Sequence, residues 1–311
     1  MRVGVLTSAR AGASVICLLA GMVIFAPAVG TAQEMVHFEA SAPDSPTQVE
    51  LRAELYRPDG NGQFPAVVLM HGCGGWQPAV RYGLQTHARY LQQHGFVVLN
   101  VDSFGPRDRA GGKMCASDPA LYKALDYRTS DAFDSLRYLQ KQNFVSPANV
   151  FLMGQSNGGA VAVRVAKAVA AKAYQDSSLP TFRGVVAYYP WCGEVGSRIS
   201  LSSPLLIFAG GKDDWVPARE CQGARASGAA LQVRVYPEAA HSFDLDIIKQ
   251  RYLGKLIGAD EPATQDSRER MLAFFVGNLT PDSRNGPRGV PADRIIVAQN
   301  ATAVVAGDFL P

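Results

Sequence analysis

The sequence predicts an α/β protein with a mostly parallel central sheet and helices on both faces. Two observations indicate this class. Apolar runs of strand length alternate along the chain with segments of helical periodicity. Loops rich in glycine and polar residues directly follow the apolar runs, at the edge where open α/β sheets place their sites. The expected strands are residues 65–70, 96–101, 150–153, 183–189, 204–210 and 231–236, and the expected helices are residues 80–94, 118–144, 159–169 and 268–279.

The early elements follow from local patterns. Residues 65–70 are an uninterrupted apolar run, and residues 96–101 are a second run just after a helix that ends at His94. A long helix is expected to begin with Asp118 as its cap and Pro119 at its first position. Aspartate accepts hydrogen bonds from the free amides of a first turn, and proline has no amide hydrogen to satisfy there.

The later elements complete the expected sheet and its cover. Residues 183–189 and 204–210 are apolar runs, whereas residues 231–236 alternate between apolar and polar side chains. Residues 268–279 carry apolar side chains at helical spacing and are expected to form the closing helix. His37 lies in a further expected strand near the N-terminus.

Ser156 is the centre of the pentapeptide Gly-Gln-Ser-Asn-Gly at residues 154–158. An expected strand precedes it and an expected helix follows it, which is the setting that a nucleophile elbow requires. The glycines on either side would let the tight turn pass close to neighbouring backbone. Ser156 is therefore the candidate nucleophile.

A catalytic serine needs a base to take its proton and an acid to orient that base. Asp213 and Asp214 follow the strand 204–210, and His241 follows the strand 231–236. The order Ser, Asp, His is the one expected after a nucleophile elbow. His241 is the only one of the five histidines that follows the acid loop. Asp213 is preferred as the acid, and Asp214 is the alternative.

The other histidines are interpreted as structural. His87 and His94 lie seven residues apart on one face of a helix, and His94 precedes a glycine at the helix end, where a cation suits the helix dipole. His71 is expected to brace the glycine-rich loop at residues 71–76. His37 has no evident partner in the sequence.

An oxyanion hole requires two backbone N–H donors. The residue after the nucleophile, Asn157, is expected to provide one of them. The glycine-rich loop after the strand 65–70 is expected to provide the other, from Cys73 or, as second choice, from Gly72. In both cases the donor is the main-chain amide.

Five segments together carry a family resemblance: residues 71–76, 101–107, 154–159, 210–217 and 240–243. With these motifs the chain resembles the dienelactone hydrolase family over roughly residues 50–278. The resemblance implies an α/β-hydrolase fold and ester or lactone hydrolysis. The family pattern Gly-x-Asp-x-x-Val-Pro matches residues 211–217 and favours Asp213 as the acid.

The chain departs from that family's best-known members at the nucleophile. Those members carry a cysteine in the elbow, where this chain has Ser156. They also use a glutamate near the first oxyanion loop, whereas residues 69–76 contain no carboxylate. A lactone specificity tied to a thiol is therefore not expected here, and a serine triad is.

Length and composition fit one large globular domain behind a leader. The 311 residues are 47% hydrophobic and 18% charged. Residues 1–32 combine a positive start, an apolar stretch and small residues near position 32, as a secretory signal peptide does. An uncleaved membrane anchor is the alternative. Residues 33–279 are the expected catalytic domain, and residues 280–311 are an extension expected to be partly disordered.

Charge and cysteine content agree with an exported protein of the periplasm or the extracellular space. The formal charge falls from +3 to about +1 without Arg2 and Arg10, so nothing indicates binding to nucleic acid or anionic membrane. Four cysteines remain after the leader, and an even number in an exported chain suggests disulfides. Of three possible pairings, Cys73–Cys115 and Cys192–Cys221 are preferred, because each pair flanks one active-site loop. The spacing of cysteines and histidines does not favour a metal site.

Six side chains near the expected active edge are candidates for a substrate pocket. Five are aromatic and one is a cation that could hold a carboxylate: Trp76, Tyr122, Trp191, Trp215, Phe243 and Arg107. For each of them, packing or a loop salt bridge is the competing interpretation.

The expected function is an exported serine hydrolase that cleaves small-molecule carboxylic esters or lactones without a cofactor or metal. One alternative is a peptidase of the prolyl-oligopeptidase type, although few residues precede the core. The other is a non-catalytic binding protein on the same fold. The sequence does not indicate the oligomeric state or the natural substrate.

Overall fold

The computed structural model describes residues 1, 4, 33–41, 49–109, 112–174 and 178–280. The predicted signal peptide and the extension at residues 281–311 lie outside this range. The elements below all belong to the compact unit that spans Thr31–Pro311. Among its described residues, no helix combines the length and apolar character needed to cross a membrane.

The centre of the unit is an eight-stranded sheet with strand order β1-β2-β4-β3-β5-β6-β8-β10. β1 pairs antiparallel with β2, and β2 pairs antiparallel with β4. From β4 to β10 every neighbouring pair is parallel. The strands are β1 (Gln33–Ala40), β2 (Val49–Tyr56), β3 (Phe64–Met70), β4 (Val97–Asp102), β5 (Val145–Gln155), β6 (Val185–Tyr188), β8 (Leu205–Gly210) and β10 (Leu231–Tyr236).

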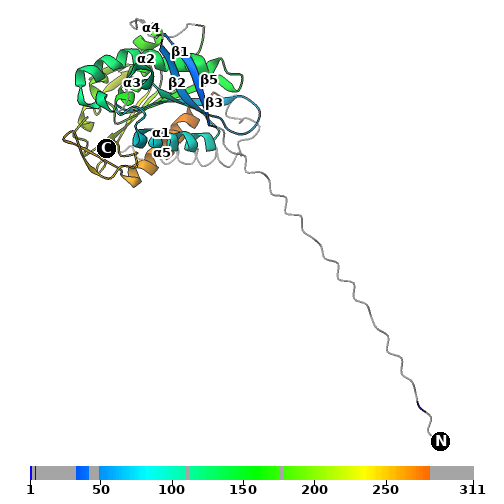
Figure 1. Ribbon diagram of the computed structural model, residues 1–311. Helices are drawn as coiled ribbons and strands as arrows, with labels where there is room; N and C mark the ends of the chain where they lie inside the picture. The colour runs from blue at the N-terminus through cyan, green and yellow to red at the C-terminus, as the bar shows by residue number, and fades with distance from the viewer. Residues whose placement is uncertain (2–3, 5–32, 42–48, 110–111, 175–177, 281–311) are drawn as a thin grey trace. The chain divides into compact units, whose positions relative to one another are not determined.

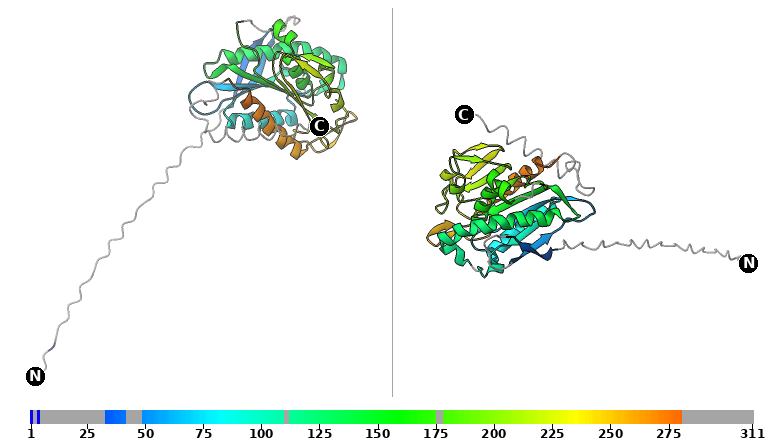
Figure 2. Two further views of the ribbon diagram at one scale, coloured as in Figure 1. Left: turned by 180° about the vertical axis from the view of Figure 1, so that it is seen from behind. Right: turned by 90° about the horizontal axis from the view of Figure 1, so that it is seen from above.

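Helices cover both faces of this sheet, which confirms the predicted fold class. Figure 1 shows α2 (Asp118–Gln140), α3 (Asn157–Ala166) and α4 (Ala168–Tyr174) on one side, with α1 (Pro78–Gln93) and α5 (Glu261–Gly277) on the other. The two further views in Figure 2 show the same three layers.

Side-chain alternation along the strands produces two cores, one under each helix layer. In β3, Val68 and Met70 pack in the cluster that includes α2 and α3. Val67 and Leu69 point the opposite way and pack in the cluster that includes α1 and α5. Because successive strand residues face opposite sides, a strand covered on both faces reads as one apolar run, as residues 65–70 do.

Several element boundaries differ from the expected ones. α2 is capped by Ser117, whose hydroxyl accepts from the Ala120 amide at 3.4 Å, so Asp118 is the first helical residue rather than the cap. α2 ends at Gln140 and not near residue 144. The closing helix begins at Glu261, one residue after the capping Asp260, which is seven residues earlier than the pattern indicated.

The helix expected at residues 159–169 is interrupted. α3 ends at Ala166, and Lys167 adopts an extended conformation with ψ 140° before α4 begins. Lys167 forms an isolated β-bridge with Leu201, and its Nζ lies 2.8 Å from the Glu194 carboxylate. These two long-range contacts stabilise a break that local helix propensity opposes.

The sequence pattern missed three pairs of strands. The β1–β2 pair extends the sheet beyond β4, with only the His37 strand anticipated. The short strands β7 (Arg198–Ser200) and β9 (Arg225–Ser227) pair with each other. β11 (Gln250–Tyr252) and β12 (Lys255–Ile257) form a hairpin shortly after the His241 loop.

Candidate active site

Ser156 lies in a sharp turn between β5 and α3. Its φ of 54° is in the left-handed region, which is uncommon for residues other than glycine and marks a strained position. The turn fits only because its neighbours lack side chains: a Cβ at Gly154 would collide with the carbonyl of Gly158, and one at Gly158 would collide with that of Met70. The local geometry is that of a nucleophile elbow.

The side chains of Ser156, His241 and Asp213 form one hydrogen-bonded chain. His241 Nε2 lies 2.9 Å from Ser156 Oγ, and His241 Nδ1 lies 2.7 Å from Asp213 Oδ2. Asp213 and His241 are both buried. Asp213 Oδ1 also accepts from the amides of Trp215 and Val216, each at 2.9 Å, so its carboxylate is fixed in orientation.

Asp214 points away from this chain and anchors the β11–β12 hairpin. Its Oδ1 accepts from the Leu256 amide at 2.7 Å, and its Oδ2 accepts from Arg251 Nη1 at 2.9 Å. These bonds hold the pKa of the Asp214 carboxyl below its usual value. The hairpin in turn contacts the backbone of His241, whose amide donates to the Leu256 carbonyl. Asp213 therefore holds the side chain of His241, and Asp214 holds the hairpin that contacts its backbone.

The imidazole of His241 is confined by aromatic rings. The ring centroids of Trp215 and Tyr189 lie 5.1 and 4.7 Å from that of His241. These contacts limit rotation of the ring between its two hydrogen-bond partners.

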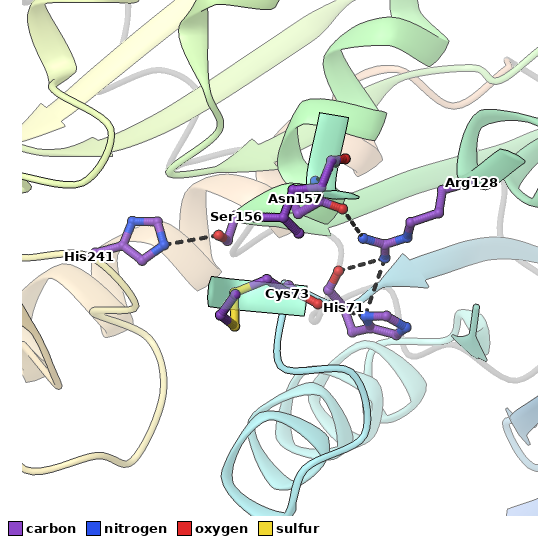
Figure 3. The surroundings of a disulfide bond; sticks show 9 residues. His71, Cys73, Arg128, Ser156, Asn157 and His241 are labelled. Atoms are coloured by element: carbon purple, nitrogen blue, oxygen red, sulfur yellow. Dashed lines mark hydrogen bonds between the residues drawn. A yellow bond between two sulfur atoms is a disulfide. The ribbon is translucent and has the colours of Figure 1, made fainter. Parts of the chain in front are cut away.

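The two expected oxyanion donors lie on either side of Ser156. Figure 3 shows Cys73 and Asn157 flanking the serine side chain. A Cβ added to Gly72 would lie 3.3 Å from the Cβ of Ser156, so the glycine-rich loop approaches the elbow closely. Within the described residues, neither the amide of Asn157 nor that of Cys73 donates a hydrogen bond to another backbone group. Both donors are thus available to a substrate oxygen.

His71 is fully buried and packs under the glycine-rich loop. Its Nδ1 donates to the Gly72 carbonyl at 2.7 Å, and its Nε2 accepts from the Ser103 amide at 3.2 Å. Burial and then the nearby charge of Arg128 lower the pKa of His71 to about 3. A neutral imidazole with both nitrogens engaged in this way braces the loop.

A cavity of about 1160 Å³ opens in front of Ser156. Its walls come from the start of α2, the elbow, the loop after β6 and the β11–β12 hairpin. Three of the candidate pocket residues line it, namely Tyr122, Trp191 and Trp215. The rings of Tyr122 and Trp191 meet edge to face with centroids 5.7 Å apart, and both are exposed.

The other three candidates do not line this cavity. Trp76 instead forms cation–π contacts with Arg52 and Arg81, whose guanidinium carbons lie 5.3 and 4.5 Å from the centroid of its ring. Arg107 forms a bidentate salt bridge with Asp131 at 2.8 and 2.9 Å. This is the salt bridge that the sequence analysis gave as the alternative to a role in the pocket. Phe243 is fully buried in the core beneath α1 and α5.

Comparison with known proteins identifies the family. The model of the dienelactone hydrolase family matches residues 51–279, which is most of the chain. The chain belongs to the dienelactone hydrolase family. Members of this family are hydrolases, and the chain is accordingly a carboxylic ester hydrolase.

Three proteins similar to this dienelactone hydrolase family member have low sequence identity to it. A Yersinia pestis protein named "Putative carboxymethylenebutenolidase" is 24% identical over 244 residues, covering 73% of this chain and 83% of that protein. Two solved structures share the fold. A dienelactone hydrolase-like promiscuous phosphotriesterase from metagenomic libraries has a TM-score of 0.56 at 17% identity, covering 80% of this chain and 100% of its own. A thermophilic esterase of Thermogutta terrifontis has a TM-score of 0.54 at 19% identity, covering 81% and 97%.

Both predicted disulfides are present in this dienelactone hydrolase family member. Cys73 is joined to Cys115 and Cys192 to Cys221, each pair with Cα atoms 5.0 Å apart. The first ties the glycine-rich loop to the segment before α2, and both of its cysteines line the cavity. Cys221 directly follows the short 3-10 turn at Ala218–Glu220.

A buried carboxylate behind the elbow was missed by the sequence analysis. Asp244 accepts from Gln155 Nε2 at 2.6 Å, from the Tyr189 hydroxyl at 2.5 Å and from His87 Nε2 at 2.7 Å. Burial alone would raise the pKa of Asp244, but these hydrogen bonds lower it overall. In the sequence, only its position three residues after His241 pointed to a role for Asp244 near the site. That position did not indicate its hydrogen-bond partners.

The titration of His87 gives a testable consequence. Burial lowers the pKa of His87 below 6.5, although Asp244 opposes the shift. Below that pH the unfolded chain therefore binds a proton that the folded chain does not, and the free energy of unfolding falls as the pH falls. His87→Gln keeps a donor for Asp244 but does not titrate. We expect the variant's unfolding free energy to depend less steeply on pH below 6.5, by up to about 1.4 kcal/mol per pH unit. Denaturant titrations at several pH values measure this slope, and equal slopes would contradict it.

Proposed function

We propose that this chain is an exported serine hydrolase that cleaves carboxylic esters or lactones through Ser156, His241 and Asp213. The observation that carries the proposal is the position of His241, 2.9 Å from Ser156 Oγ on one nitrogen and 2.7 Å from Asp213 on the other. A base held between a serine in a strained turn and a buried carboxylate has the arrangement that serine activation needs.

The proposed reaction proceeds through an acyl-enzyme. Ser156 Oγ attacks the substrate carbonyl carbon while His241 Nε2 takes the hydroxyl proton. Asp213 keeps the other proton on Nδ1 and stabilises the imidazolium that forms. The amides of Asn157 and Cys73 hold the negative oxygen of the tetrahedral intermediate. His241 then returns its proton to the departing alkoxide, and a water molecule activated by His241 releases the acid and restores Ser156.

The cavity favours a small-molecule ester with an apolar or aromatic part. Tyr122, Trp191 and Trp215 present ring surface next to Ser156. Aromatic faces and edges bind apolar and aromatic groups favourably. A lactone would follow the same steps, with its leaving alcohol still attached to the acyl group.

Two measurements test the proposed function. A fluorophosphonate probe should label the purified protein, and mass mapping should place the adduct on Ser156. A panel of p-nitrophenyl esters, lactones and aminoacyl amides should then show turnover of esters or lactones and little of amides. An unlabelled protein would refute the serine mechanism, and preferential amide cleavage would instead support a peptidase.

Export is proposed from two features. Residues 1–32 have the pattern of a secretory signal peptide. Four of the five cysteines form disulfides, which persist in oxidising compartments and are rare in the cytosol. N-terminal sequencing of the protein from its native host, together with fractionation of that host, tests cleavage near residue 32.

The Cys73–Cys115 bridge should matter for turnover as well as stability. We expect Cys73→Ala with Cys115→Ala to lower kcat by about tenfold. Complete loss of one oxyanion donor lowers kcat by about 10²–10³, and a Cys73 amide that is only less well held should cost less. Cys192→Ala with Cys221→Ala is the matched control. It should lose a comparable stability, about 2–4 kcal/mol, with kcat nearly unchanged. Kinetics and denaturant unfolding of both double variants measure the difference, and equal kcat values would contradict it.

A further inference from the structure

Arg128 is a fully buried arginine on α2 that the triad itself does not use. Its Nη1 donates to Asn157 Oδ1 at 2.5 Å, and its Nη2 donates to the His71 carbonyl at 2.6 Å and lies 3.3 Å from His71 Nδ1. The guanidinium carbon lies 4.8 Å from the centre of the Phe104 ring. In the part of the chain that the structure describes, no carboxylate forms a salt bridge with Arg128 within 4.0 Å.

Such an arrangement is costly for stability. A buried charge is normally paired, because removing it from water carries a penalty that only good partners offset. Arg107 contacts the same helix and follows this rule through Asp131. Burial lowers the pKa of Arg128 to about 10, so the side chain still carries its charge at neutral pH. Asp131 and Asp102 attract this charge only at longer range, without a hydrogen bond to it, so its burial calls for a benefit elsewhere.

The two acceptors of Arg128 belong to the two segments that carry the proposed oxyanion donors. The His71 carbonyl lies in the loop two residues before the Cys73 amide. The Asn157 side chain belongs to the residue whose own amide is the other donor. Figure 3 shows the guanidinium reaching both segments from the side away from His241.

The planar guanidinium of Arg128 can set the distance between the glycine-rich loop and the elbow. Guanidinium nitrogens are held in one rigid plane, so two hydrogen bonds from it fix the relative position of their acceptors. A second bond, from Asn157 Nδ2 to the Leu121 carbonyl at 3.3 Å, holds the same residue against α2. The glycine-rich loop and the elbow are thereby attached to one helix through one side chain.

We propose that Arg128 is a positioning residue for the oxyanion hole, which holds the Cys73 and Asn157 amides in register and places a positive charge behind them. The inference rests on the proposed serine mechanism. It predicts an effect on the tetrahedral intermediate rather than on substrate binding, because negative charge appears on the carbonyl oxygen only as that intermediate forms.

The kinetic test compares three variants. Arg128→Met keeps a long side chain but removes the charge and the two guanidinium hydrogen bonds. It should lower kcat by on the order of 10² and change KM by less than about threefold. Arg128→Lys keeps the charge but cannot donate in the same two-pronged geometry, so it should remain at least about tenfold below wild type. Arg137→Met is the matched control on the same helix, since Arg137 contacts Asp134, Ser41 and the Tyr174 carbonyl instead. Its kcat should stay within about twofold of wild type.

A spectroscopic readout separates this role from general support of the fold. A trifluoromethyl ketone should add to Ser156 and give a hemiketal whose oxygen occupies the oxyanion hole. Carbon-13 NMR of the labelled carbonyl carbon reports the pKa of that hemiketal. Arg128→Met should raise this pKa by about two units, the equivalent of a 10²-fold loss. If Arg128→Met does not fold, Asn157→Ala removes one prong and should raise the pKa by a smaller amount.

The outcomes distinguish the two proposals. No adduct on Ser156 in the wild-type protein would refute the serine mechanism and with it this inference. A wild-type adduct with the same hemiketal pKa in Arg128→Met, or in Asn157→Ala, would leave the serine mechanism standing and overturn the role of Arg128. Full recovery of kcat in Arg128→Lys would also overturn the positioning role, because charge alone would then suffice.

Discussion

Replacing Ser156 with alanine should abolish ester turnover while leaving the fold intact. The change removes the hydroxyl that would attack the carbonyl, and loss of a triad member lowers kcat by on the order of 10⁴–10⁶. Within the part of the chain that the structure describes, the Ser156 hydroxyl forms a hydrogen bond only with His241, so its loss should change the free energy of unfolding by less than about 1 kcal/mol. Steady-state kinetics and denaturant unfolding measure the two effects.

Ser202→Ala provides the control for this substitution. Its hydroxyl donates to the Ala166 carbonyl at 3.2 Å, at the break between α3 and α4, and it does not line the cavity. Its kcat should match that of the wild type. If Ser156→Ala kept more than about a tenth of the wild-type kcat/KM, the assignment of the elbow as the nucleophile would be wrong.

Asp213→Asn should lower kcat by roughly 10³–10⁴. An asparagine at this position can donate to Nδ1, which favours the imidazole tautomer that cannot accept the Ser156 proton on Nε2. The asparagine oxygen can still accept from the amides of Trp215 and Val216, so the loop itself should be preserved. The expected loss is therefore in kcat, with little change in stability.

Asp214→Asn is the matched partner of that variant. The Asp214 carboxylate is partly exposed and accepts hydrogen bonds from Arg251 and from the Leu256 amide. The side-chain oxygen of an asparagine can accept one of these bonds in its place. We expect a kcat within about tenfold of wild type, because only the hairpin beside His241 is loosened. If Asp214→Asn lost more activity than Asp213→Asn, the role of triad acid would move to Asp214.

The features that sequence predicted well are those set by short, contiguous patterns. The strand before Ser156, the two glycines and the following helix are all within about twenty residues, so the elbow is encoded locally. The strands β3, β4 and β8 are recognisable because both of their faces are buried and each therefore reads as one apolar run. The order of the candidate triad residues along the chain also follows from the sequence alone.

The features that sequence could not predict depend on contacts between distant segments. Nothing local marks Trp76 as a partner of Arg52 and Arg81, or Phe243 as a core residue rather than a pocket residue. Lys167 breaks a helix only because Leu201 and Glu194 lie beside it. Aromatic side chains fit a cavity wall and a core equally well, so their location is decided by packing.

By itself, the sequence determined the fold class, the candidate nucleophile, the histidine and the preferred disulfide pairing, because motif spacing and chain order restrict each of these. Only the tertiary structure decided which of two adjacent aspartates faces His241, since successive side chains point in different directions and the loop's path selects one. It also decided that Arg128, far from Cys73 and Asn157 along the chain, contacts the segments that carry both proposed oxyanion donors. Hydrogen bonds of this kind join elements that only the packed sheet and its helices bring together.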